Sequence, residues 1–188
     1  MIYGKKKIKG VLEIMTVPIA ITPSPRVNLP HHRIHEGRYF AVTATAVGLS
    51  AGIPKNYLII SPPAAISIAH VITIVTVFPG ATFEFFEGTI VSANGTPLPS
   101  FNQDRANPAV ATGFAFEDPV VVTNGTRIFS QIIGSTTTGG TGGTKERDEE
   151  EFDFIPLTNY LLRTTPLSNN TLLSIQMRAY RQATATGT

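Results

Sequence analysis

The chain has 188 residues, no cysteine and a formal net charge of +2. This length predicts about one domain, and the lack of cysteine excludes disulfide bonds and thiolate metal sites. Only 15% of the residues are charged, compared with about 25% in an average soluble protein. A chain so poor in charge is expected to have part of its surface covered by partner subunits.

Residues 1–30 are expected to form an extended arm. Prolines recur there among short apolar pairs, and proline disfavours both helices and central strands. These prolines are Pro18, Pro23, Pro25 and Pro30. Basic residues are concentrated in the same segment, at Lys5, Lys6, Lys7 and Lys9. Because basic and aromatic residues are not interleaved over the rest of the chain, a partner-docking arm is favoured over nucleic-acid binding.

Neither a membrane span nor a signal peptide is predicted. The longest apolar run, around His70, contains threonine and histidine and is shorter than the ~20 residues of a membrane helix. Glu13 and Pro18 interrupt the apolar residues behind the N-terminal lysines, which argues against a secretory signal. Met15 could equally be the natural start.

The stretch from Ala64 to Gly88 is predicted to form the centre of the fold. Its first half is apolar on both faces in a period-two reading, as in a strand that is covered above and below. Its β-branched residues disfavour a helix. Pro79-Gly80 then precedes a second strand with Phe83 and Phe85, and the two strands are expected to form a hairpin.

Further short strands are predicted on both sides of this stretch. They lie at about 38–47, 56–61, 89–92, 112–116, 119–123, 127–133, 158–165 and 172–181. Asn94-Gly95 and Asn124-Gly125 indicate turns, and the polar loop over 97–108 is expected to bond its own backbone. About eight to ten short strands without an amphipathic helix predict an all-β, jelly-roll-like antiparallel β-sandwich.

The sandwich domain is expected to span 31–182, followed by a polar tail at 183–188. Within it, a long loop is predicted at 134–151, where the glycine- and threonine-rich GSTTTGGTGGT precedes a charged run. Such loops are usually functional or disordered. Lys145 and Arg147 in this run are predicted partner contacts, together with the four lysines of the arm.

Histidines gather ahead of the first predicted strand, at His31, His32 and His35 beside Glu36. Imidazoles and a carboxylate near the start of a jelly roll invite comparison with cupins, which hold a metal with such groups. In an extended segment, however, His32 and His35 point to opposite faces. A hydrogen-bonded structural or interfacial role is therefore favoured over a metal site.

Catalysis is not predicted. The sequence has no Gly-x-Ser-x-Gly elbow and no acid in a recognisable order with a histidine. The glycine run at 139–143 lacks the Gly-Lys-Ser/Thr ending of a phosphate loop. We therefore expect a non-enzymatic protein without a cofactor.

The order of several short motifs resembles a group of small tailed-phage virion proteins. The matching motifs are His32-Arg33-Ile34-His35-Glu36-Gly37, Ala69-His70, Phe85-Phe86-Glu87-Gly88, the polar loop at 102–107, the glycine-rich loop, Asn159-Tyr160-Leu161-Leu162-Arg163 and the final strand at 174–181. The polar loop is short of arginine, and the final strand lacks the family's acidic-aromatic ending.

This resemblance implies a head decoration or cement protein made in the host cytoplasm. Such a protein would sit as a homotrimeric jelly roll on the outside of a bacteriophage capsid and clamp neighbouring copies of the major capsid protein. One alternative is a carbohydrate- or receptor-binding jelly roll of a tail fibre, although the chain has no tryptophan and five tyrosines. A second alternative is a cupin-like metalloprotein with His32, His35 and Glu36 as ligands.

Overall fold

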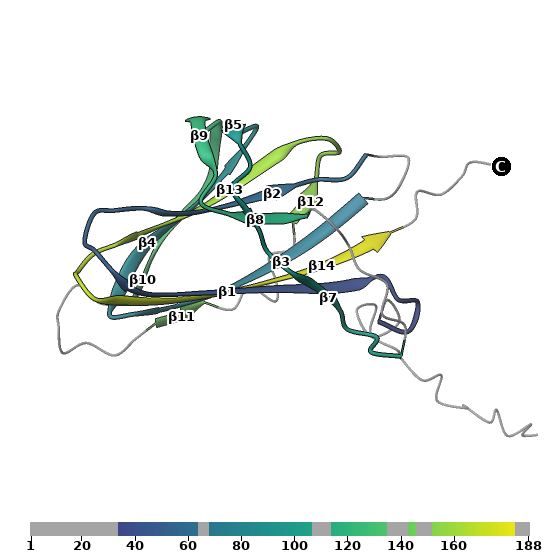
Figure 1. Cartoon of the computed structure of the whole chain (residues 1–188), viewed down its shortest axis with the longest axis horizontal. Helices are drawn as coiled ribbons and strands as arrows, with labels where there is room; N and C mark the ends of the chain where they lie inside the picture. The colour runs from purple at the N-terminus through teal and green to yellow at the C-terminus, as the bar shows by residue number, and fades with distance from the viewer. Residues whose placement is uncertain (1–33, 64–67, 107–113, 135–142, 146–151, 183–188) are drawn as a thin grey trace, which may run out of the picture.

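A computed structural model describes residues 34–63, 68–106, 114–134, 143–145 and 152–182 of the chain (Figure 1). The predicted arm, the polar tail and most of the predicted loop at 134–151 lie outside these residues. Within the described part, regular structure consists of antiparallel strands, as the sequence predicts. No helix in these ranges is long and apolar enough to cross a membrane.

Two six-stranded sheets make up the body of the fold. Sheet A has the order β11-β3-β14-β1-β7, and β12 also pairs with β3. Its strands are β1 (Tyr39–Leu49), β3 (Ile68–Phe78), β7 (Ser100–Asn102), β11 (Gly143–Lys145), β12 (Phe152–Phe154) and β14 (Thr171–Gln182). Sheet B has the order β10-β4-β13-β2-β8-β6. Its strands are β2 (Lys55–Ile60), β4 (Gly80–Glu87), β6 (Thr96–Pro97), β8 (Ala115–Glu117), β10 (Thr126–Gly134) and β13 (Asn159–Pro166).

The strand order is that of a jelly roll. Counting β1, β2, β3, β4, β10, β11 with β12, β13 and β14 as the principal strands, sheet A joins the first, eighth, third and sixth. Sheet B joins the second, seventh, fourth and fifth. This interleaving defines a double Greek key. The predicted fold class is confirmed.

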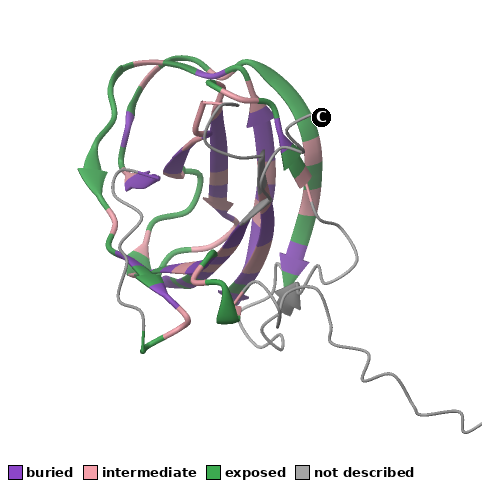
Figure 2. Ribbon diagram, turned by 90° about the vertical axis from the view of Figure 1, so that its right-hand side faces the viewer, coloured by how far each residue is buried: buried purple, intermediate pink, exposed green. Residues whose placement is uncertain are grey.

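The core lies between the two sheets, where period-two alternation places one apolar set from each strand. Sheet A contributes Val42, Val71, Val75, Leu173, Ile175 and Met177, and sheet B contributes Tyr57, Ile59, Phe83, Phe85 and Leu162. Towards one end, the ring of Phe154 stacks on that of Tyr160 with centroids 3.9 Å apart. Figure 2 shows the buried segments along the facing strands.

The predicted hairpin between β3 and β4 is wrong. The two strands follow each other directly at Pro79, yet β3 pairs with β14, β11 and β12, whereas β4 pairs with β10 and β13. The chain passes from one sheet to the other because Val77 and Ala81 can then both be buried in the core. The outer face of β3 is covered only in part, since Phe78 is exposed.

The predicted loop at 134–151 is also partly wrong, because its residues Gly143–Lys145 form β11. This strand pairs with Val75–Val77 of β3, and β12 pairs with Ala69–Val71 of the same strand. An edge strand has unpaired backbone groups, and these short segments satisfy them. The polar loop predicted over 97–108 is also partly wrong, because Ser100–Asn102 form β7 and pair with β1. After β7 the loop bonds its own backbone as predicted: the amide of Asp104 donates to Asn102 Oδ1 at 2.9 Å.

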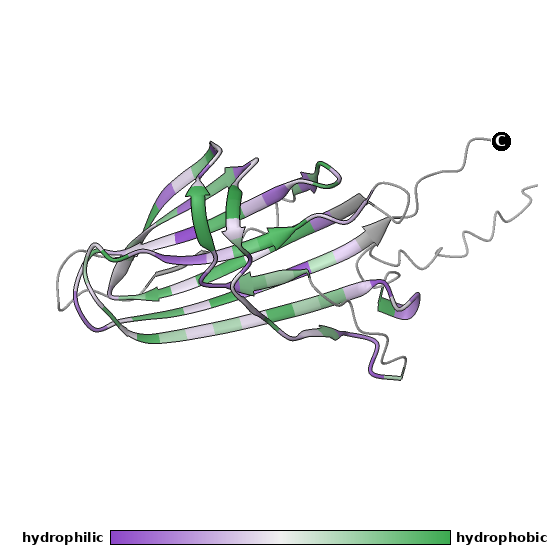
Figure 3. Ribbon diagram, turned by 45° about the horizontal axis from the view of Figure 1, so that its top comes forward, coloured by the Kyte–Doolittle hydropathy of each residue, from purple (hydrophilic) through white to green (hydrophobic). Residues whose placement is uncertain are grey.

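Two strands leave the sandwich and form a separate ribbon. They are β5 (Ile90–Ala93) and β9 (Val120–Thr123), which we call the strap. The strap starts at the β4–β10 edge of sheet B and leads to β6–β8 at the opposite edge. The distance from β4 to β8 is three strand spacings, about 14 Å, which a four-residue strand spans. In Figures 1 and 3 its strands run across those of the sheet.

Apolar side chains on the outer face of sheet B, which the strap crosses, are buried. Leu58 and Leu161 alternate with core residues and therefore point outward, yet both are fully buried. On the strap, Val91 and Val121 pair with each other and are half-buried. We infer that this side of the strap packs on the sheet.

Candidate functional site

Two apolar surfaces stand out among the described residues, and neither has the character of a catalytic site. The first lies on the outer face of sheet A, near the ends of β1, β3 and β14. The second is the outward face of the strap. A third group of polar residues, around Lys55, joins the strap to the sandwich and has a structural role.

The outer face of sheet A contains a hollow of about 300 Å³. Its lining residues come from three neighbouring strands and include no acidic or basic side chain. They are Thr45, Ala46, Val47, Thr76, Phe78, Leu172, Leu173 and Ser174. Pairing of Leu172 with Phe78 and of Ser174 with Thr76 fixes this arrangement. We call this hollow the groove.

Large apolar side chains are exposed around the groove. Phe78 is 46% exposed, Leu172 47% and Val47 76%. Surface apolar residues scattered singly are ordinary, whereas a contiguous group marks a binding surface. The exposed lining of the groove is almost entirely apolar, although Thr45, Thr76 and Ser174 contribute to it. This disfavours a small polar ligand, since such ligands are oriented by a few placed polar groups.

The opposite end of the same sheet face is closed by a row of aromatic rings. Tyr180 stacks on His70 at 4.6 Å between centroids and lies parallel to Tyr39 at 6.0 Å. Both tyrosines are buried. His70 Nδ1 contacts the carboxylate of Asp153, which lies opposite it on β12. The row of rings therefore contacts β12 through His70 and Asp153. Because its tyrosines are buried, it offers no open aromatic platform to a sugar.

The strap presents the second apolar surface. Ile90, Val120 and Val122 are each more than half exposed, at 57%, 56% and 61%. They lie on the side of the strap that faces away from Val91 and Val121. Figure 3 shows the hydrophobic colouring of these two crossing strands. A short, projecting ribbon with β-branched side chains outward is well suited to contact another protein surface.

Hydrogen bonds from sheet B fix the base of the strap. Arg163 Nη2 donates to Asn124 Oδ1 at 2.6 Å, and its Nε donates to Asn56 Oδ1 at 3.1 Å. The guanidinium also lies over the ring of Phe86, 5.3 Å from its centroid. Thr89 Oγ1 donates to the carbonyl of Asn124 at 2.6 Å.

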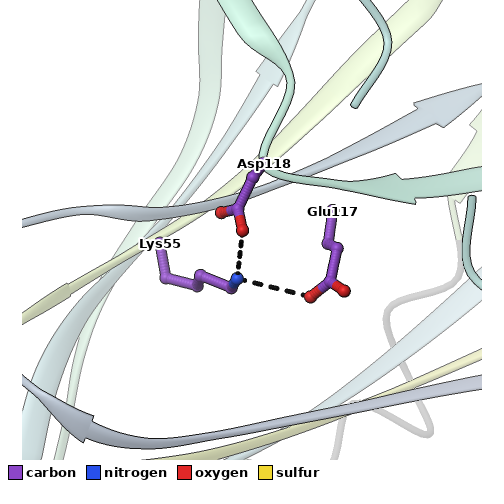
Figure 4. A network of polar contacts seen from close by, with 3 residues as sticks. All are labelled: Lys55, Glu117 and Asp118. Carbon is purple, nitrogen blue, oxygen red and sulfur yellow. Dashed lines mark hydrogen bonds and ion pairs between the residues drawn. The ribbon is translucent and has the colours of Figure 1, made fainter. Parts of the chain in front are cut away.

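A charged cluster fixes the other end of the strap, where β8 meets β2 (Figure 4). Lys55 Nζ lies 2.6 Å from Asp118 Oδ2 and 3.3 Å from Glu117 Oε2. Burial acts to lower the pKa of Lys55, but hydrogen bonds and attraction from the two carboxylates outweigh it, so the pKa is raised. The ammonium therefore stays protonated and is not a candidate base.

Tyr57 lies beside this cluster, 5.7 Å from Lys55 Nζ at its ring centroid. Its side chain is fully buried, and its hydroxyl has no hydrogen-bond partner among the described residues. Burial, and then the charges of Glu117 and Asp118, raise the pKa of this hydroxyl well above its usual value. The hydroxyl stays neutral and contributes no charge to a site.

The predicted metal ligands do not meet in the described structure. His35 and Glu36 are exposed in the turn ahead of β1, and His32 lies outside the described residues. His70 points to the outer face of sheet A, away from the interior that a cupin metal occupies. In the ranges that the structure describes, no three histidine, aspartate or glutamate side chains are grouped to hold a metal.

The predicted partner contacts fall largely outside the structure. Lys5, Lys6, Lys7, Lys9 and Arg147 lie outside the described residues, and only the backbone of Lys145 is described, in β11. The strap, by contrast, was not predicted as a unit. Its strands were expected, and Val120-Val121-Val122, apolar on both faces of a short strand, is the pattern that could have indicated an isolated ribbon.

Comparison with known proteins gives no match to a family model and no match to a curated sequence.

Proposed function

We propose that this protein is a structural virion protein, a decoration or cement protein that binds the outside of a phage capsid and clamps neighbouring capsid subunits. The order of the sequence motifs supports this proposal. The jelly roll is compatible with it, because that fold occurs in viral capsid proteins, but it also occurs in lectins and cupins. The fold alone therefore does not decide the function.

The observation that carries the proposal is the exposed apolar face of the strap. Three β-branched side chains are exposed on a ribbon that crosses the sheet and together form a raised apolar surface. Ligand pockets for small molecules are concave, and raised or flat apolar surfaces fit macromolecular partners. We propose the strap as a contact with the major capsid protein.

The remaining partner contacts are proposed as well. Lys5, Lys6, Lys7 and Lys9 would contribute charge attraction towards acidic capsid surface, and Lys145 and Arg147 would do so from the charged run. Assembly as a homotrimer would cover part of a surface that has few charges. No catalytic step is proposed.

A co-sedimentation experiment with heads of the phage that encodes the chain tests this proposal. The wild-type protein is expected to sediment with heads and to saturate at a copy number set by the capsid lattice. Val122→Asp is expected to weaken binding at least tenfold, because it places a charge in an apolar contact. Ile132→Asp, on β10 and equally exposed, is the matched control and should bind like wild type.

Three outcomes would count against the proposal in different ways. Wild-type protein that stays in the supernatant at all concentrations would remove the capsid as a partner. Equal binding of the two variants would remove the strap from the contact. Undiminished binding after deletion of residues 1–25 would show that the basic arm does not contribute to capsid binding.

The carbohydrate-binding alternative is less favoured because Tyr39 and Tyr180 are buried. Binding of the purified protein to a glycan array would revive it.

A further inference from the structure

We propose that the groove on the outer face of sheet A is the docking site for residues 17–21 of the same chain. These residues belong to the N-terminal segment that precedes the described structure. The inference does not depend on capsid binding, because it concerns a contact within one chain.

The chemistry of the groove limits what can occupy it. The stretches 43–47, 74–78 and 172–176 that surround it contain no acidic or basic residue. An occupant with a charge would lose hydration there without gaining a partner. The exposed rings and methyl groups of Phe78, Leu172 and Val47 are stabilised instead by apolar contacts.

Residues 14–25 have the matching chemistry. The sequence IMTVPIAITPSP is the longest stretch without a charged residue among the parts of the chain outside the described ranges. In an extended backbone Val17, Ile19 and Ile21 point to the same side. This side therefore offers three β-branched aliphatic groups in a row.

Proline favours docking onto the face of the sheet over pairing at its edge. Pro18 and Pro23 lack an N–H donor, so neither can donate a backbone hydrogen bond in strand pairing. A segment that contacts a sheet through side chains does not need these donors. The groove spans β1, β14 and β3, about 10 Å across, and Val17 to Ile21 covers about 13 Å when extended.

The chain is long enough to make this contact. The first described residue is Ile34, just before β1, and the groove lies near Ala46 of β1. From Tyr39 to Ala46 the strand advances about 24 Å. Thirteen residues from Ile21 to Ile34 reach up to about 43 Å. A tethered segment also binds at a high effective concentration, so weak apolar contacts suffice.

Cysteine pairing in the full-length chain provides a direct test, because the natural sequence has no cysteine. Ile19→Cys is combined with Ser174→Cys, which lies in the groove on β14. The matched control combines Ile19→Cys with Ser130→Cys, exposed on β10 of the other sheet. Disulfide formation is followed on non-reducing gels and by peptide mapping, since a bond requires Cα atoms within about 7 Å.

The proposal expects the groove pair to close within one chain at least tenfold faster than the control pair. Equal rates for the two pairs would overturn it. A covalent dimer or larger species as the main product would also overturn it, because a second copy would then supply the occupant.

Proteolysis gives an independent measurement on folded protein. Thermolysin cleaves at exposed aliphatic residues, so docking is expected to protect the bonds at Val17, Ile19 and Ile21. Leu172→Asp should speed cleavage there at least tenfold, whereas Ile132→Asp should leave the rate unchanged. Circular dichroism and melting confirm that both variants are folded. Cleavage of the wild type as fast as a free peptide of residues 14–25 would contradict docking.

Discussion

The α-carbon of Gly95 faces the backbone of Glu117 so closely that a β-carbon on Gly95 would lie 2.1 Å from the Glu117 carbonyl oxygen. Gly95 has a φ of 90°. Asp118, which directly follows Glu117, has a φ of 53°. Gly125 repeats the relationship at the other end of the strap, where an added β-carbon would lie 2.2 Å from the carbonyl oxygen of Glu87. These left-handed residues bend the ribbon at both ends of the strap.

Gly95→Ala is therefore expected to destabilise the fold by about 3 kcal/mol, because the substitution adds both backbone strain and a clash with fixed backbone atoms. Gly52→Ala is the control: Gly52 has a φ of 72° but nothing within 4 Å of a β-carbon. Strain alone should cost about 1–2 kcal/mol there. Urea unfolding measures both. A Gly95 variant no less stable than the Gly52 variant would contradict the close approach.

Two buried tyrosines should respond in opposite ways to loss of the hydroxyl. Tyr160 donates to Glu87 Oε2 at 3.0 Å and accepts from the Ile155 amide at 2.8 Å, whereas the Tyr57 hydroxyl has no partner among the described residues. Tyr160→Phe should cost about 1–2 kcal/mol. Tyr57→Phe should be neutral or should stabilise the protein, since an unsatisfied buried hydroxyl is removed. Urea unfolding midpoints of the two variants measure these effects. A Tyr57→Phe variant less stable than the Tyr160→Phe variant would contradict these contacts.

The fold should lose stability at alkaline pH. Burial, and then a hydrogen bond and charge from Glu87, raise the pKa of Tyr160 to about 12, although the Ile155 amide acts against this. Its contribution is therefore complete below about pH 10, the usual pKa of tyrosine, and is lost as the pH rises towards 12. The raised pKa values of Tyr57 and Lys55 act in the same direction.

Urea unfolding at pH 8 and at pH 11 measures this loss. Tyr160→Phe should lose less stability than wild type between the two pH values, because the variant has no hydroxyl to ionise at position 160. An equal loss in both proteins would mean that Tyr160 does not titrate with unfolding.

Local patterns were enough to predict the longer strands and the fold class, but not the short strands β6, β7, β11 and β12. The alternation in 172–181 and the β-branched run before Pro79 depend only on neighbouring residues, and both became strands of sheet A. The pairing partner of each strand was harder to predict from the sequence. Pro79-Gly80 is compatible with a hairpin and with a crossing between sheets, and the choice depends on burial of Val77 and Ala81 in a core built from distant segments.

The groove and the strap could not be predicted as surfaces for the same reason. Leu172 and Phe78 are 94 positions apart in the numbering but lie opposite each other in the β14–β3 pairing. Lys55 likewise meets Glu117 and Asp118 only because β8 adds to β2. Residue types indicated neither contact, since each depends on the register of two strands that are distant in sequence.

Arg163 should contribute more to stability than the better exposed Arg127, although both pair across strands. Arg163 connects Asn56 and Asn124 and covers Phe86, so it joins the strap to sheet B. Arg127 pairs with Glu84 at 2.9 Å with a side chain that is 59% exposed. Arg163→Ala should cost about 2–3 kcal/mol, because hydrogen bonds to a charged group and packing are lost together. Arg127→Ala should cost below about 1 kcal/mol, as exposed ion pairs do.

Arg163→Lys separates the positive charge of the guanidinium from its hydrogen bonds to two amide oxygens. Lysine retains the charge but cannot reach both amide oxygens with a planar fork, so most of the loss should remain. Hydrogen exchange of the strap amides gives the local measurement: exchange at Val91 and Val121 should accelerate in Arg163→Ala and stay unchanged in Arg127→Ala. Equal protection in the two variants would mean that the strap is held by its apolar contacts with sheet B, without help from Arg163.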